Sequence, residues 1–462
     1  MALSKIWSAF ILIAIAVATF QVVFTSDAPT MYNAMVAGKS GDTLVIKKSS
    51  PAVADSAQAL AIASQNGKYK AAFTKDGAVK TYKIQQADGI IETCQTAVTL
   101  SLRLIGFMAL FMGLMSIAEK AGGIRFLSRL IGPFFSRIFP DIPKNHPSMG
   151  HMMMNFSANL LGLDNAATPF GIKAMESLQE INPNKTTASN PQIMFLCLHA
   201  SGLTLIPVSI IALRSAAGAE NPMDIFIPCM IATFAATMAA LFIVSFKQKI
   251  RLAHPVIIAW IAGISALIAL LVVYIKSLSS DEVSVFSGAL SSGLILLIFL
   301  LIIGVAAYRK LDVFSAFVEG AKGGFETAVK IIPYLVGMLV AISLLRTSGT
   351  FGIVIDGIKT LVNATGMDTR WIDGIPTALV KPFSGGGARG MMVDTMNTFG
   401  ADSFAGKLSC VLQGSSDTTF YVIAVYFGAV AVKNTRYTVG AMLLADLAGI
   451  ITSILLAYLF FG

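Results

Sequence analysis

Charged side chains are scarce in this chain, and their scarcity restricts the class of protein to which it can belong. Only 13% of the 462 residues are charged, whereas hydrophobic residues make up 55% and the mean hydropathy is +0.74. A soluble domain carries about 25% charged residues. The composition therefore excludes an ordinary soluble domain and predicts a protein of the lipid bilayer.

Cysteine and histidine are also few, with four residues of each type. The cysteines lack the paired spacing of a disulfide framework or a zinc site, and all lie within or beside apolar segments. We therefore interpret them as small buried hydrophobic side chains. His146 and His151 are close in sequence, but no carboxylate or cysteine stands at ligand spacing, so no metal site is predicted.

Signatures of enzymes are missing too. The chain contains no Gly-x-Ser-x-Gly, no His-Glu-x-x-His and no Walker loop. We therefore predict that the protein is not an enzyme, that it is not coupled directly to ATP and that it holds no cofactor. A coupling ion, H⁺ or Na⁺, is left open.

Long apolar runs are abundant. Each is near or above the ~18–20 residues that a helix needs to cross hydrocarbon. They predict an all-α polytopic membrane protein with spans at Ile6–Phe24, Val98–Ala118, Ile193–Leu213, Ile225–Phe246, Val256–Ile275, Gly288–Tyr308 and Tyr437–Phe461.

The net charge is +9, and the basic residues lie mainly in the connectors between these runs, as at Arg125, Lys247, Arg309 and Arg436. Lysine and arginine concentrate in the cytoplasmic loops of membrane proteins and attract anionic lipid. The pattern therefore favours membrane lipid as a partner, excludes a nucleic-acid partner and places the protein in a bacterial cytoplasmic (inner) membrane.

The first 89 residues predict a span followed by a domain outside the membrane. The apolar run within 1–26 exceeds the ~7–15 residues of a signal-peptide core, so we expect an uncleaved span. Residues 27–89 then form a small β-rich extracytoplasmic insert. Asp76-Gly77 between two alternating segments, Tyr69–Thr74 and Ala78–Ile84, predicts a β-hairpin there.

One element occurs twice in the remaining chain. Without gaps, Thr204 falls on Thr418 and Ser215 on Ala429, and each copy follows a polar, Gly- or Asn-rich break in apolar sequence. Duplicated broken segments mark the substrate site between two membrane repeats. We predict gate-type repeats at 90–250 and 311–462, each with a re-entrant hairpin, and two linking spans at 251–310. When the membrane crossings are counted with the basic connectors on the cytoplasmic side, the two repeats have opposite orientations in the membrane, that is, they are inverted.

The motifs in these repeats resemble a known family. Residues 90–250 are similar to spore maturation protein A, in Gly150–Asn155, Asn159–Met175 and Ser201–Ala216. Residues 285–462 are similar to spore maturation protein B, in Ala316–Gly349, Pro382–Met391 and above all Gln413–Gly428. The resemblance covers about three quarters of the chain and implies a natural fusion of the two. It also implies the nucleoside-recognition, or gate, grouping, which includes concentrative nucleoside transporters and gate regions of the ferrous-iron transporter.

Polar residues at the breaks are the candidate substrate-binding residues, because helix ends exposed at a break can hold charged or polar groups. Among them Asp164 and Asp417 are the leading carboxylates for a coupling ion or proton, and Arg389 is a candidate clamp for a carboxylate or phosphate. The full set is Asn159, Asp164, Asn165, Thr168, His199, Ser201, Thr204, Ser384, Arg389, Gln413, Ser415, Ser416, Asp417, Thr418 and Thr419.

Structural roles are open for the same residues. The two aspartates suit helix caps, and Arg389 suits a side chain that extends to the lipid headgroups. Asn159, four residues after Asn155, suits hydrogen bonding between helices. Pro169 suits the first turn of a helix that starts after the break.

The sequence supports two hypotheses of function, which belong to different functional classes. The first is a secondary transporter or exporter of a small polar solute, coupled to H⁺ or Na⁺, with its site between the two hairpins. The alternative is a non-transporting scaffold for maturation or dehydration of an envelope or spore core, with residues 27–89 as its docking module. The identity of the solute (nucleoside, amino acid, metal or lipid-linked species), the direction of transport and a homo-oligomeric state are left open.

Overall fold

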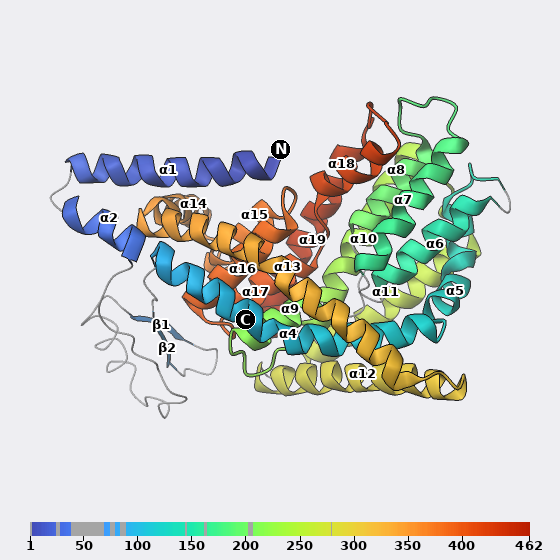
Figure 1. Cartoon of the computed structure of the whole chain (residues 1–462), viewed down its shortest axis with the longest axis horizontal. Helices are drawn as coiled ribbons and strands as arrows, with labels where there is room; N and C mark the ends of the chain where they lie inside the picture. Colours follow the sequence, from blue (N-terminus) through green and yellow to red (C-terminus); the bar gives the residue numbers. More distant parts are fainter. Residues whose placement is uncertain are drawn as a thin grey trace.

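The structure is a computed structural model that describes residues 2–24, 28–37, 69–73, 79–83, 89–143, 146–160, 164–201, 207–278 and 280–462. Figure 1 shows an elongated assembly of helices with one small β-hairpin at its left end. Six helices are long and apolar enough to cross a membrane, and a bent pair, Leu335–Thr347 with Thr350–Asn363, adds a seventh candidate at an angle of 70°. The prediction of a multi-pass, mainly α-helical membrane protein is confirmed.

The described helices of the two halves follow the same order. Each half has a long helix, an amphipathic helix, two hairpin helices, a helix interrupted by a break, and a final span. In the first half these are α4 (Ile90–Lys120), α5 (Gly123–Ile138), α6 (Pro147–Leu160), α7 (Asp164–Glu180), α8 (Asn190–Ala200), α9 (Val208–Ala216) and α10 (Phe226–Gln248). In the second they are α13 (Val313–Thr347), α14 (Thr350–Asn363), α15 (Pro376–Val380), α16 (Gly385–Phe399), α17 (Phe404–Gly414), α18 (Thr419–Ala429) and α19 (Thr438–Phe461), with a short 3₁₀ turn η1 (Arg370–Asp373) before α15.

The other elements lie outside these two sets. The N-terminal helices α1 (Ala2–Phe24) and α2 (Ala28–Ala37) lie beside α13 and α4, at the left in Figure 1. The linking helices α11 (Pro255–Lys276) and α12 (Ser280–Tyr308) connect the halves. Most of the surface of α11 faces away from the protein, as expected for a helix in contact with lipid.

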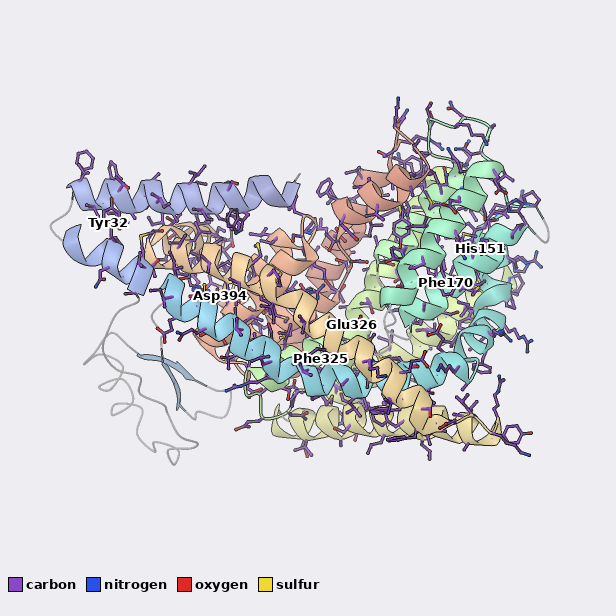
Figure 2. The ribbon with its side chains drawn as sticks, viewed as in Figure 1. Tyr32, His151, Phe170, Phe325, Glu326 and Asp394 are labelled. Carbon is purple, nitrogen blue, oxygen red and sulfur yellow. The ribbon has the colours of Figure 1, made fainter. Side chains whose placement is uncertain are left out.

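The first helices of the two halves, α4 and α13, pack along each other in opposite directions. Gly324 lies against Met108 and Ala109, whereas Gly113 lies against Phe317, so position numbers rise along one helix as they fall along the other. Small residues let helix backbones approach closely where the solvent is lipid. Further along α13, Arg346 pairs with Asp394 of α16 through hydrogen bonds of 2.8 and 2.7 Å from its Nε atom. Figure 2 marks Asp394 in this region.

The insert is described only in part. Strands β1 (Tyr69–Phe73) and β2 (Val79–Lys83) pair antiparallel, with Tyr69 opposite Lys83 and Phe73 opposite Val79. The hairpin predicted around Asp76-Gly77 therefore has its two strands. Whether residues 27–89 form a β-rich domain stays a prediction, because residues 38–68 and the turn at 74–78 lie outside the described residues.

Two local expectations need correction. The run Ile193–Leu213 is not one continuous span, because α8 ends at Ala200 and α9 begins only at Val208. Pro169 does not stand in the first turn of its helix, because α7 already begins at Asp164 and contains the proline. The hydrophobic runs identify which segments are apolar, but they do not show where a helix stops within them.

We predict that Gly324→Ala destabilises the protein and that Gly323→Ala does not. A methyl group at Gly324 would come within 2.6 Å of backbone atoms of Met108 and Ala109, whereas at Gly323 the nearest atom is the Met112 methyl, 3.9 Å away. Overpacking of this kind costs about 1–3 kcal/mol. The free energy of unfolding in detergent micelles should therefore fall for Gly324→Ala and not for Gly323→Ala. Equal values for the two variants would contradict the packing of α4 on α13.

Candidate functional site

The two interrupted helices lie side by side and run in opposite directions. Their breaks meet where the backbone N–H of Asp417 donates to the carbonyl of Ala200 at 2.7 Å. At the end where α8 begins and α18 finishes, which we call the α8–α18 end, the N–H of Lys433 donates to the Thr186 carbonyl at 2.9 Å. At the α9–α17 end, Arg214 donates to the Ala401 carbonyl at 2.6 Å. The α8–α9 segment therefore lies against the α18–α17 segment along its length.

Serine residues delimit both helices in the same way. The Ser189 hydroxyl accepts from the Gln192 N–H at the start of α8, and the Ser403 hydroxyl accepts from the Gly406 N–H at the start of α17. At the other end, Ser201 and Ser415 are the C-caps, and each hydroxyl donates to a carbonyl three residues back. These bonds satisfy backbone groups at the helix ends. Two predicted binding residues, Ser201 and Ser415, thus have structural roles.

A polar cluster lies at the C-terminal end of α8. The His199 Nδ1 atom is 2.9 Å from Asn159 Nδ2 and 3.0 Å from Asn155 Oδ1, both on α6. The Nε2 atom of the same ring is 4.0 Å from the Asp417 carboxylate, which belongs to the other break and is about half exposed. The structure therefore brings together three predicted residues, Asn159, His199 and Asp417, and adds Asn155.

Tyr426 of α18 closes this cluster on another side. Its ring packs edge-on against His199, with 4.8 Å between the ring centroids. It also lies over Gly171 of α7, where an added methyl group would come within 2.7 Å of the tyrosine oxygen. Thr168, another predicted residue, interacts with Tyr426 from α7. The His199 ring thus lies between α6 and α18, and α7 contacts Tyr426.

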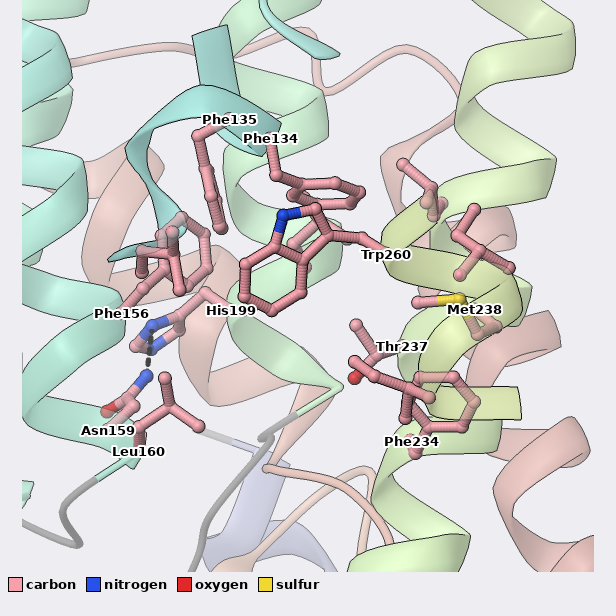
Figure 3. A pocket seen from close by; sticks show the side chains of 15 residues that line it. Phe134, Phe135, Phe156, Asn159, Leu160, His199, Phe234, Thr237, Met238 and Trp260 are labelled. Atoms are coloured by element: carbon pink, nitrogen blue, oxygen red, sulfur yellow. Dashed lines mark hydrogen bonds between the residues drawn. The ribbon is translucent and has the colours of Figure 1, made fainter. Parts of the chain in front are cut away.

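An aromatic cavity of about 120 Å³ adjoins the cluster (Figure 3). Asn159 and His199 lie at one end of it, and Thr237 is the third polar residue of its lining. The remaining lining is apolar and includes Phe134, Phe135, Phe156, Phe234 and Trp260. A polar edge beside aromatic walls suits a compact solute that has both polar and apolar faces.

A second polar cluster lies at the C-terminal end of α17. The buried ammonium of Lys381 donates to the Gln413 carbonyl at 2.6 Å, and the buried side-chain oxygen of Gln413 has no hydrogen-bond partner among the described residues. Thr419, at the start of α18, donates to Asp446 of α19 at 2.5 Å. A buried acceptor without a partner costs about 1–3 kcal/mol. This oxygen therefore requires a donor that the described residues do not supply, such as water or a solute.

Three further predicted residues of the second half lie at the start of α16. The Ser384 hydroxyl caps this helix by accepting from the Gly387 N–H at 2.9 Å. A methyl group added at Gly385 would come within 2.7 Å of the Thr418 hydroxyl and 4.0 Å of the Arg389 guanidinium. Thr418 and Arg389 thus lie at the same helix end. Ser416, which is buried, lies in the break between α17 and α18.

Three predicted residues are not placed. Thr204 lies outside the described residues, and for Asp164 and Asn165 the structure describes only the backbone, at the N-terminus of α7. Sequence reasoning also missed Lys381, Tyr426 and Asp446. Asp446 carried a usable signal, because it is an acidic residue in the middle of an apolar run.

Four charged residues form a cluster around the buried Arg214 and Asp224 at the α9–α17 end, which we call the Arg214 cluster. The Arg214 side chain is fully buried and contacts Asp224 at 2.9 Å and Asp402 at 3.0 Å. Lys407 contacts Asp224 at 2.8 Å. Two cations and two anions balance each other, which is the condition for burying charge. The cluster joins the α9–α10 loop of the first half to the α16–α17 loop of the second.

The fold and this site define a multi-pass membrane protein whose two interrupted helices form a common polar site. The sequence model described as "Gate: Nucleoside recognition" matches residues 101–217 and 328–433. Spore maturation protein B of Bacillus subtilis (strain 168) is 45% identical over 166 residues, which are 35% of this chain and 92% of that protein. Spore maturation protein A of the same organism is 42% identical over 156 residues, 34% of this chain and 80% of that protein.

The chain belongs to the family of these spore maturation proteins, as the resemblance predicted. No solved structure matches it.

We predict that Arg214→Met destabilises the protein strongly. Removing the guanidinium leaves the carboxylates of Asp224 and Asp402 without their shared partner, and breaking a buried pair costs about 3–5 kcal/mol. Glu319→Gln, which removes an exposed partner of Lys120, is the control and should leave the unfolding midpoint unchanged. Denaturant unfolding in micelles measures both. An Arg214→Met protein as stable as Glu319→Gln would show that the cluster does not hold the two loops together.

Proposed function

We propose that the protein is a secondary transporter or exporter of a small polar solute, coupled to an ion, with its site at the meeting point of the two breaks. The observation that carries this proposal is the bond between the Asp417 N–H and the Ala200 carbonyl. This bond joins the breaks of the two interrupted helices, which run in opposite directions. Broken helices in membrane proteins are tolerated where they line a cavity, and carriers use them to bind substrate and ion.

The two halves are proposed to be inverted repeats. The gate sequence model matches both halves. The pairs α4–α13 and α8–α9 with α18–α17 each place corresponding helices antiparallel, as an axis of twofold symmetry in the membrane plane requires. The last spans of the two halves also pack closely, since a methyl group added at Gly449 of α19 would come within 3.3 Å of Ala236 of α10. Alternating access would then arise from movement of one repeat against the other.

The orientation proposed is that of a bacterial cytoplasmic membrane, with residues 27–89 outside. In Figure 1 the α12–α13 junction, which carries Arg309 and Lys310, lies at the right end, whereas β1 and β2 lie at the left. Lys120 pairs with Glu319 on the side of this junction. Basic residues on the side opposite the insert support a cytoplasmic location for that side.

The solute is proposed to be compact and polar on one face. His199, Asn159 and the unpaired Gln413 oxygen supply hydrogen-bond groups, and the cavity beside His199 supplies apolar contact. Neither cluster resembles a catalytic site in our interpretation, so an enzymatic activity is not part of the proposal.

We predict that Asp417→Asn reduces transport and that Asp356→Asn does not. Asp417 faces His199 across 4.0 Å, whereas Asp356 is exposed on α14. The asparagine keeps the shape of the side chain but removes the carboxylate charge proposed to bind the coupling ion, so uptake should fall about tenfold or more, which corresponds to about 1.4 kcal/mol or more. The measurement is accumulation of a labelled mixture of nucleosides and amino acids by proteoliposomes under imposed H⁺ or Na⁺ gradients.

The same assay tests the proposal against its alternative. If the wild-type protein moves no solute of the mixture under either gradient, the transporter proposal fails. A protein that tolerates Asp417→Asn in cells but loses function when residues 27–89 are deleted would instead behave as a scaffold.

A further inference from the structure

Asp446 is a carboxylate buried within a membrane span. It lies in α19, between Thr438 and Phe461, and only 5% of its surface is exposed. An ionisable residue at such a position is costly and is retained where it pairs with another group or moves a charge. The carboxylate is therefore almost fully enclosed by the protein in this conformation.

The partners of Asp446 connect it to both ends of the second break. Thr419, the first residue of α18, donates to it at 2.5 Å, and Ser416, one residue before Asp417, also interacts with it. Lys381 interacts with it electrostatically and also holds the end of α17 through the Gln413 carbonyl. The charge on Asp446 therefore acts on both helices that flank the break.

The chemistry of these partners favours a proton over a metal ion. A sodium ion would be a second cation beside the ammonium of Lys381, whereas a proton only neutralises the carboxylate. Hydroxyl groups can donate or accept. Thr419 and Ser416 donate to the ionised carboxylate, and either can accept from the protonated acid, so the site accommodates both states without an unpaired group.

We propose that Asp446 binds and releases the coupling proton of this protein, and that its protonation changes the hydrogen bond that holds the start of α18 to α19. The inference rests on the proposed transport function. Among the described residues, the other ionisable groups that interact with the carboxylate are Lys381, Asp417 and, from α8, Cys197. Protonation would replace the charge-assisted bond of Thr419 by a weaker neutral one and so loosen α18, which carries Tyr426 against the His199 ring.

The first test measures proton binding directly and needs no solute. Infrared difference spectra of the protein in lipid, recorded between neutral and acidic pH, should contain the carbonyl band of a buried protonated carboxylic acid. We expect this band to be lost in Asp446→Asn, to shift in Thr419→Val, which removes one hydroxyl, and to remain in Asp356→Asn. Retention of the full band in Asp446→Asn would overturn the assignment, whether or not the protein transports a solute.

The second test separates coupling from transport. Proteoliposomes are loaded with the labelled mixture of nucleosides and amino acids, with and without a pH gradient. Asp446→Asn should still let the transported solute equilibrate between the two sides but should lose its accumulation against a gradient. If Asp446→Asn accumulates solute as the wild type does, the carboxylate is not the coupling site. If the wild type moves none of the mixture, the transport function itself fails, and the infrared result still decides whether Asp446 binds a proton.

Discussion

The structure depends on one constraint, which is that a helix interrupted in hydrocarbon must have its free backbone groups satisfied by the protein. The partners come partly from the other half and partly from the same half. The Ala200 carbonyl at the end of α8 accepts from the Asp417 N–H of the other half. At the second break, Lys381 serves the Gln413 carbonyl, and the Phe420 N–H donates to the Pro382 carbonyl. The bond between Asp417 and Ala200 satisfies one backbone group of each break, so association of the halves stabilises both interrupted helices.

Close approach follows from that requirement. Gly414 at the end of α17 lies so near Cys229 of α10 that a methyl group would come within 2.7 Å of its sulfur, and Gly449 of α19 lies against Ser415 and Ala236. The spans α10 and α19 thus pack onto the breaks through small residues, as helices do in membranes. Polar side chains that would be unpaired in lipid, such as His199 and Asp446, are therefore buried against these breaks by the same contacts.

The sequence predicts which spans, breaks and strands the structure contains better than it predicts the contacts between them. Apolar runs identify the spans, and the duplicated element identifies both breaks, because each depends on residues close in the chain. The hairpin strands β1 and β2 follow from local alternation in the same way. The pairing of Thr419 with Asp446, and of Arg214 with Asp402, depends on helices brought together by packing, which no local pattern records. The sequence also does not distinguish Ser201 and Ser415, whose hydroxyls are used by the helix ends, from neighbours whose polar groups face the site.

The two ends of the interrupted helices are closed by interactions of unequal strength. At the α9–α17 end, the fully buried Arg214 holds carboxylates of both halves. At the α8–α18 end, backbone bonds such as Lys433 N–H to the Thr186 carbonyl, and the bond from Arg436 to Asn190, join the halves at a more exposed position. Breaking a buried ion pair costs about 3–5 kcal/mol, whereas an ordinary hydrogen bond contributes about 0.5–1.5 kcal/mol. In a carrier that alternates between two open states, the Arg214 end would therefore be the harder to open from this conformation. A bound solute or proton that favours opening there must supply the larger difference in free energy, since a ligand shifts an equilibrium only by its differential affinity for the two states.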